Sequence, residues 1–200
     1  MPSILVFLYF GVLIEQLYAL NYQFPQPDGG IRHPGRHSSL IVCSLGCAVS
    51  TLYPILLGSD SPTLANPLGR IAAVCFLSSL SLFYWTARTT QPGRFSVIFG
   101  AVQPELVVTH GPFAYIRHPT YVSYTLAWIG AIAMSIGGRA GFELLLPVAL
   151  GFFAGLLWLY RQGAEQEEGE FRNEAKTVQV SEQYEAYKGS VRARWIPYVV

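Results

Sequence analysis

The stretch YVSYTLAWIGAIAMSIGGRAGFELLLPVALGFFAGLLWLY, residues 121–160, decides the fold of this chain. It holds two apolar runs, residues 121–136 and 142–160, which are separated only by the short segment GGRAG. A helix needs about 20 apolar residues to cross the hydrocarbon core of a bilayer. So short a connection forces the two helices to run antiparallel. The stretch therefore predicts two membrane-spanning helices in a tight hairpin.

Three further apolar runs precede the hairpin, at residues 3–20, 39–57 and 68–87. Charged residues make up 12% of the chain, whereas a soluble domain carries about 25%. Of the 25 charged residues, 13 lie in the last 40 residues. We therefore expect an all-α, polytopic membrane protein with about five transmembrane helices and a charged, helical C-terminal tail.

The first apolar run lacks a basic leader and a small-residue cleavage site, so we expect a retained span rather than a removed signal peptide. Glu15 lies inside this run. A carboxylate at membrane depth should face other helices or a wet cavity.

The basic residues predict the orientation, because short cytosolic loops are enriched in Lys and Arg. If the C-terminus is cytosolic, all basic residues except Arg70 and Arg139 fall on the cytosolic side. We therefore expect a lumenal N-terminus and a cytosolic C-terminus. The two long polar segments, residues 88–119 and 161–200, then share the cytosolic face.

We expect one domain over residues 1–200, with the less easily assigned N-terminal spans in residues 1–100. The chain shows no internal repeat or low-complexity tract, and its net charge of +1 gives no reason to expect a nucleic acid partner. Cys43, Cys47 and Cys75 lie in apolar runs, as is typical of buried small side chains. Their spacing predicts neither a metal site nor a disulfide framework.

Two polar segments carry the candidate chemistry. In residues 106–121, LVVTHGPFAYIRHPTY, Arg117 and His118 come directly before the fourth span, where a helix N-terminus favours an anionic group. The alternative is an interfacial Arg and His without a ligand. In residues 161–168, RQGAEQEE, Arg161 and Glu165 share one face if the helix continues. The alternative there is a solvated ion pair.

Around these segments the sequence resembles the isoprenylcysteine carboxyl methyltransferase family of small membrane methyltransferases. The family pattern is Leu-Val, Gly-x-Tyr, Arg-His-Pro-x-Tyr, a helical hairpin, Arg-x-x-x-Glu and a Tyr-x-x-Tyr tail that ends near Ile-Pro. The corresponding pieces here are residues 107–108, 111–113, 117–121, 161–165, 184–187 and 195–198. They cover about the last 100 residues, in the same order around a hairpin.

The resemblance implies that residues 101–200 form a core that binds S-adenosylmethionine. Glu165 would hold the ammonium group of this cofactor, and Arg161 would bind the carboxylate of the substrate. The stretch between Glu165 and Tyr184 is longer than is usual in the family, so Glu167 or Glu168 is an alternative to Glu165. The other implied cofactor contacts are Glu105, Leu106, Val107, Val108, Phe113, His118, Pro119, Thr120 and Tyr121. The pattern departs from the family at Glu105, where many members have His, at Phe113, which lacks the usual hydroxyl, and at Ser123, where Gly is frequent.

The implied reaction is methyl transfer to the C-terminal carboxylate of a prenylated cysteine, in the endoplasmic reticulum membrane. The partners would be a prenylated protein or peptide and membrane lipid, and no metal is needed. A carboxylate is already ionised at neutral pH, so the resemblance implies no catalytic base. Three alternatives remain: another lipophilic acceptor such as a phospholipid amine, a membrane reductase that uses NADPH, and a non-catalytic relative of the family.

Overall fold

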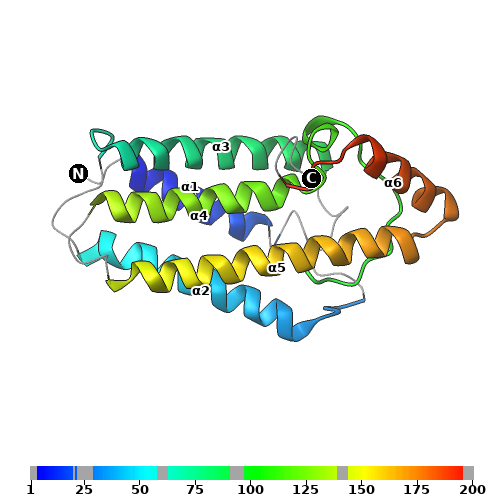
Figure 1. The fold of residues 1–200 in the computed structure, drawn as a ribbon, viewed down its shortest axis with the longest axis horizontal. Coiled ribbons are helices and arrows are strands. Elements are labelled where there is room, and N and C mark those ends of the chain that lie inside the picture. The colour runs from blue at the N-terminus through cyan, green and yellow to red at the C-terminus, as the bar shows by residue number, and fades with distance from the viewer. Residues whose placement is uncertain are drawn as a thin grey trace.

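The computed structural model describes residues 4–19, 21, 29–57, 63–90, 97–138 and 144–195. Within these residues the chain forms six α-helices, one short 3-10 helix and no β-strand, which confirms the all-α prediction. The helices lie lengthwise along an elongated molecule, with α6 at one end (Figure 1). Their bounds are α1 Ile4–Tyr18, α2 Pro34–Leu57, α3 Pro67–Thr90, η2 Gly111–Ala114, α4 Pro119–Gly138, α5 Leu146–Asn173 and α6 Val178–Ser190.

The helix bounds follow recognisable signals. Proline opens α2, α3 and α4, where its missing N–H costs no hydrogen bond. The Oδ1 atom of Asn66 accepts a hydrogen bond from the Leu68 N–H (2.9 Å), and its Nδ2 donates to the Gly137 carbonyl (2.9 Å). Asn66 therefore fixes the start of α3 and ties it to the end of α4.

The helix α5 continues well past the predicted end of its apolar run at Tyr160, because the residues that follow are mostly good helix formers such as Gln, Ala and Glu. This confirms that Arg161 and Glu165 share a helix. The turn of the predicted hairpin lies largely outside the described residues, while α4 and α5 lie side by side and antiparallel (Figure 1).

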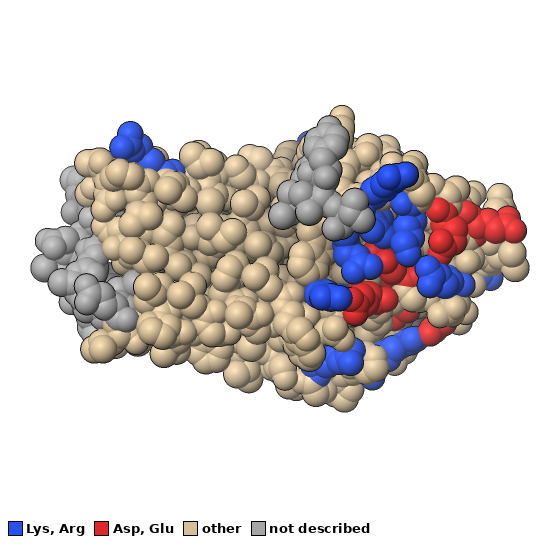
Figure 2. All heavy atoms as spheres, viewed as in Figure 1, with Lys and Arg blue, Asp and Glu red and all other residues tan. Residues whose placement is uncertain are grey.

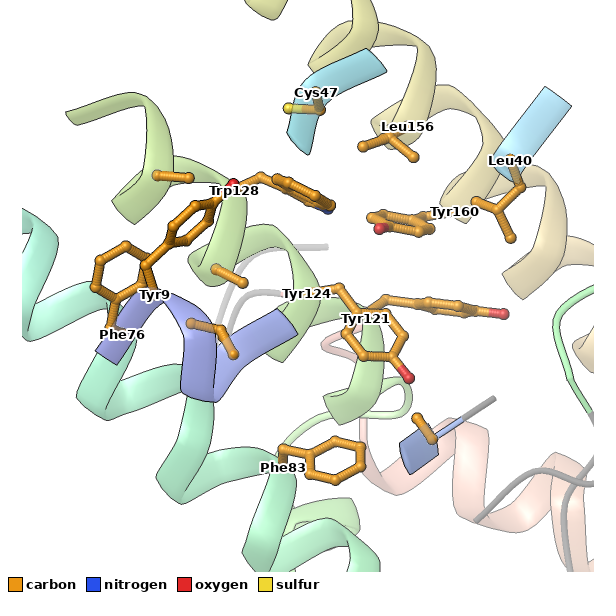
Figure 3. Close-up of a cluster of buried hydrophobic side chains, with 14 of the residues drawn as sticks. Tyr9, Leu40, Cys47, Phe76, Phe83, Tyr121, Tyr124, Trp128, Leu156 and Tyr160 are labelled. Atoms are coloured by element: carbon orange, nitrogen blue, oxygen red, sulfur yellow. The ribbon is translucent and has the colours of Figure 1, made fainter. Parts of the chain in front are cut away.

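The core lies between α1, α3 and α4 on one side and the α2–α5 pair on the other (Figure 3). A Cβ atom at Gly130 of α4 would lie 2.8 Å from the Phe76 ring of α3. The Tyr9 ring of α1 stacks on Phe76 with centroids 5.8 Å apart. The absence of a side chain at Gly130 thus allows α3 and α4 to approach each other closely.

Glu15 is buried between helices, as expected. The Ser123 hydroxyl of α4 donates to its carboxylate (2.7 Å), and Ser79 of α3 lies 3.3 Å from the same hydroxyl. Cys43, Cys47 and Cys75 are free thiols, with Cys47 fully buried.

One helix among the described residues, α3, is long and apolar enough to cross a membrane by length and composition. On the face that Figure 2 shows, Lys, Arg, Asp and Glu gather mainly at the end of the molecule that holds α6, and the rest of this face carries few charged side chains. The molecule therefore has one strongly polar end.

Candidate active site

A cleft of about 1410 Å³ is lined by α1, α2, α4, α5 and the irregular segment 97–108, which we call the mouth loop. Its polar end carries Arg32, Glu105, Glu170 and Glu174. The wall from α2 follows one helix face and becomes apolar away from that end. Its residues, spaced three and four apart, are His37, Leu40, Ile41, Ser44, Leu45 and Ala48.

His118 lies directly before α4, with its ring between two carboxylates of α5. Its Nδ1 is 3.1 Å from Glu167 Oε2, and its Nε2 is 3.3 Å from Glu168 Oε1. Burial opposes protonation of the ring, but the hydrogen bonds with the two carboxylates outweigh it and raise the pKa of His118 above its usual value. The two carboxylates therefore favour the protonated ring.

Glu168 is buried among cations. Arg117 Nη1 donates to Oε1 (2.8 Å), Arg194 donates to both oxygens (3.0 and 2.9 Å), and Lys188 Nζ lies 3.7 Å from Oε2. Burial opposes ionisation of Glu168, but the hydrogen bonds from His118 and Arg194 lower its pKa to about 2. This carboxylate is fully engaged within the protein.

Glu167 has a different environment. Its side chain is 38% exposed and lines the cleft. It accepts hydrogen bonds from the Tyr121 hydroxyl and from His118. Among the described residues no Lys or Arg forms an ion pair with it. Of the four carboxylates that line the cleft, Glu105, Glu170 and Glu174 each lie within 4 Å of a Lys or Arg, whereas Glu167 pairs with His118 instead.

The C-terminal segment 191–195 completes this site. The backbone N–H groups of Arg117 and His118 donate to the carbonyls of Ala193 (3.0 Å) and Arg194 (3.1 Å). The Tyr187 hydroxyl of α6 donates to the Phe113 carbonyl (2.7 Å). These bonds hold the residues before α4 in place, and they bring Arg194 to Glu168.

Aromatic rings form the floor of the site next to Glu167. Tyr121 lies between His118 and Tyr160, with ring centroids 5.5 and 5.4 Å apart. Figure 3 shows Tyr121, Tyr124 and Tyr160 between α4 and α5, with Trp128 beside them. A Cβ atom at Gly163 would lie 2.9 Å from the Tyr121 hydroxyl, so a glycine is needed for this approach.

Residues 29–33, which we call the strap, cross the mouth loop. The Arg32 N–H donates to the Phe99 carbonyl (2.8 Å), and the Ala101 N–H donates to the Gly30 carbonyl (3.0 Å). Gly30 has a φ of 72°, a conformation that glycine adopts without strain. The Arg32 guanidinium pairs with Glu174 and lies 3.7 Å from Glu170. The strap thus ties the start of α2 to the end of α5 across the polar end of the cleft.

The structure brings most of the residues singled out from the sequence to this cleft. Pro119 is buried at the start of α4 and is not among the described residues that line the cleft. Arg161 and Glu165 are not among them either: they pair with each other (2.9 Å) on the surface and are 65% and 41% exposed. The predicted residues that line the cleft are Glu105, Leu106, Val107, Val108, Phe113, His118, Thr120 and Tyr121.

The sequence assigned no role to the first half of the chain, although α1, α2 and the strap line the cleft. The three-and-four spacing from His37 to Ala48 is the signal that could have indicated the wall from α2. Arg194 was not singled out either, because its contact with Glu168 joins distant parts of the chain.

The described residues form helices around a cleft that carries carboxylates at one end and apolar side chains further along, so the fold is that of a helical protein with one cleft of mixed polarity. A family model described as the isoprenylcysteine carboxyl methyltransferase (ICMT) family matches residues 71–171, and the chain belongs to this family. Its membership supports a methyltransferase and confirms the resemblance seen in the sequence. No curated protein matches the chain.

Proposed function

We propose that the protein transfers a methyl group from S-adenosylmethionine to the C-terminal carboxylate of a prenylated cysteine. The observation that carries the proposal is the continuity of one cleft from Glu167 at its polar end to the apolar wall of α2. A polar cofactor and a lipid-like acceptor need such a junction, because they arrive from different phases.

The polar end fits the cofactor. Glu167 suits the ammonium group of the cofactor, because its carboxylate lines the cleft and forms no ion pair with a described Lys or Arg. The mouth-loop residues Glu105 to Val108 offer backbone groups, and His118 and Tyr121 orient Glu167. Phe113 and Thr120 line the same space, and Pro119 begins the helix that carries Thr120 and Tyr121. Glu165, on the outer side of α5, is the less suitable carboxylate.

The other end of the cleft fits a hydrocarbon chain. Leu13 and Leu17 of α1 and Leu40 and Leu45 of α2 line it. Burial contributes about 0.8 kcal/mol per CH₂ group, so a prenyl chain would bind there strongly. The cofactor supplies an electrophilic methyl group. The carboxylate is already ionised, so the protein mainly aligns the reactants, which can lower the barrier by roughly 7–11 kcal/mol.

The family resemblance assigns the acceptor carboxylate to Arg161, although this side chain pairs with Glu165 outside the described lining of the cleft, so the acceptor would have to meet it at the surface of α5. An exposed ion pair such as Arg161–Glu165 contributes about 0–1 kcal/mol, so its guanidinium can exchange Glu165 for an acceptor at little cost. The forked geometry of Arg suits a carboxylate.

We place the apolar parts of α1 to α5 across the membrane of the endoplasmic reticulum, with α5 leaving it after Tyr160, a lumenal N-terminus and a cytosolic C-terminus. The concentration of charge at the end with α6 supports this placement. So do the exposed apolar side chains along α1, α2 and α5, such as Phe7, Val49 and Trp158. The cofactor would then enter from the cytosol and the prenyl chain from the lipid.

The first test is an assay with purified protein, radiolabelled methyl donor and a prenylated cysteine analogue. We expect a base-labile methyl ester as product. Glu167→Gln should weaken cofactor binding by about tenfold or more, whereas Glu165→Gln should change it little. Transfer to another acceptor, oxidation of NADPH, or no cofactor binding would each contradict the proposal.

A lipophilic amine is a second candidate acceptor, because an amine needs a base and the cleft has one in His37. Its Nδ1 lies 3.1 Å from the Ile98 carbonyl and must donate to it, so the neutral ring keeps a lone pair on Nε2. The pH–rate profile separates the two acceptors. A carboxylate predicts little change above about pH 6, and an amine predicts a rate that rises with pH.

A further inference from the structure

The ring of His118 contacts one carboxylate through each nitrogen, Glu167 through Nδ1 and Glu168 through Nε2. A neutral imidazole has one N–H and one lone pair, so it can donate to only one carboxylate. The protonated ring donates to both. The geometry on both sides therefore requires the cation.

The described groups that contact the Glu168 carboxylate all present N–H donors, so Glu168 acts as an acceptor toward His118 as well. Arg117 and Arg194 both donate to Oε1, the oxygen that faces His118. The charged and titratable groups described around His118 and Glu168 are Glu167 on α5, Tyr121 on α4, Arg117 before α4, Tyr184, Tyr187 and Lys188 on α6, and Arg194 in the C-terminal segment.

We propose that Glu168 is a positioning residue: it keeps the His118 ring as a double donor, and His118 in turn holds Glu167 toward the cleft. This inference rests on the proposed role of Glu167 in binding the cofactor ammonium group. The two neighbouring carboxylates of α5 then have different roles. Glu167 binds the ligand, and Glu168 fixes the position of Glu167 through the protonated His118 ring.

Glu168→Gln removes the charge and keeps the shape. The glutamine oxygen should stay toward Arg117 and Arg194 and accept a hydrogen bond from His118. A neutral His118 ring has one N–H group, so if it donates to this oxygen, its lone pair faces the Glu167 carboxylate. Relative to the wild type at the same pH, the variant should bind S-adenosylmethionine about equally well near pH 6 and about tenfold more weakly near pH 8.5, because a His118 ring left with Glu167 as its one carboxylate partner loses its proton more readily. The comparison at equal pH cancels the titration of the cofactor's own amino group, which affects both proteins alike.

Arg194→Gln is the matched control, because it removes a partner from the same ion cluster and leaves the Glu168 charge in place. If the cluster only stabilised the fold, both variants would lose cofactor affinity in the same way at every pH. We expect the affinity relative to the wild type to change with pH in the Glu168 variant alone.

Histidine-labelled NMR gives a readout that does not depend on the cofactor. The His118 resonance of the wild type should remain that of a protonated ring across the same pH range, and this can be measured even if Glu168→Gln fails to fold. A wild-type His118 that titrates like a free imidazole, or a Glu168 variant whose affinity relative to the wild type does not change with pH, would overturn the proposal. A wild type that binds no cofactor while His118 stays charged would instead refute the proposed function, and the positioning role with it.

Discussion

Gly163 lies on α5 where the helix passes closest to Ile98 and Tyr121. A Cβ atom there would lie 2.8 Å from Ile98 Cγ2 and 2.9 Å from the Tyr121 hydroxyl. The Tyr121 hydroxyl donates to Glu167. A side chain at position 163 would displace this hydroxyl and so weaken its hydrogen bond to the carboxylate that we assign to the cofactor.

Gly163→Ala should therefore weaken cofactor binding about tenfold, because displacing Tyr121 removes a hydrogen bond to a charged group, worth roughly 1.5–3 kcal/mol. Gly169→Ala is the control, since it lies on the same helix with nothing within 4 Å of its added Cβ. Both variants gain the helix propensity of alanine, about 0.5–1 kcal/mol. Equal dissociation constants in calorimetry would refute the assignment.

The acidic residues of α5 show how far the site could be predicted from the sequence. Arg161 and Glu165 share a helix face, as their spacing indicated. Successive helix residues are about 100° apart, so Glu167 points away from Glu165 by about 200°. Which side of α5 meets the cleft depends on how α2 and α4 pack against it, and a single sequence does not contain that information.

At the scale of elements, the strap joins the start of α2 to α5 through Arg32. Glu170 lies beneath this junction, 5% exposed, and accepts a hydrogen bond from Gln166 (2.8 Å). Burial raises the pKa of Glu170 to about 7, although the Gln166 hydrogen bond and the Arg32 charge oppose this. The folded protein therefore favours the neutral acid, whose contribution to stability is present below about pH 4.5 and is lost as the pH rises through about 7.

Glu170→Gln imitates the neutral acid and should abolish this pH dependence. We expect its melting temperature to be close to that of the wild type near pH 5 and several degrees higher near pH 8. Glu185→Gln, at an exposed ion pair with Arg172, should show no such difference. A constant gap between Glu170→Gln and wild type at both pH values would contradict the argument.

The helices themselves were largely predictable, because apolar runs and prolines are local signals. The run 68–87 became α3, Pro67–Thr90, with small extensions at both ends. The strap was not predicted, because it pairs two irregular segments about 70 residues apart by backbone hydrogen bonds. Such pairing leaves no periodic pattern in either segment.

At the scale of the whole molecule, polarity changes along the long axis, and the cleft follows the same direction. The family match covers residues 71–171, which include His118, Glu167 and Glu168 but none of α1 or α2. The first half of the chain nevertheless supplies the apolar walls. We infer that the matched half binds the cofactor and that α1 and α2 select the acceptor.

This division predicts that the acceptor can be blocked without disturbing the cofactor. Ser44 lines the cleft from α2, so Ser44→Phe should fill the groove and raise the KM for a prenylated acceptor by about tenfold or more, a change of about 1.4 kcal/mol or more. Val42 lies about 200° around the same helix and is 59% exposed. The Phe side chain of Val42→Phe should therefore face lipid, and the variant should change neither the KM for the acceptor nor the affinity for the cofactor. Cofactor affinity should be unchanged in both variants, because Glu167 and the mouth loop are untouched. If Ser44→Phe weakened cofactor binding and acceptor binding equally, the two ligands would share one space, and the separation of roles between the halves of the chain would be wrong.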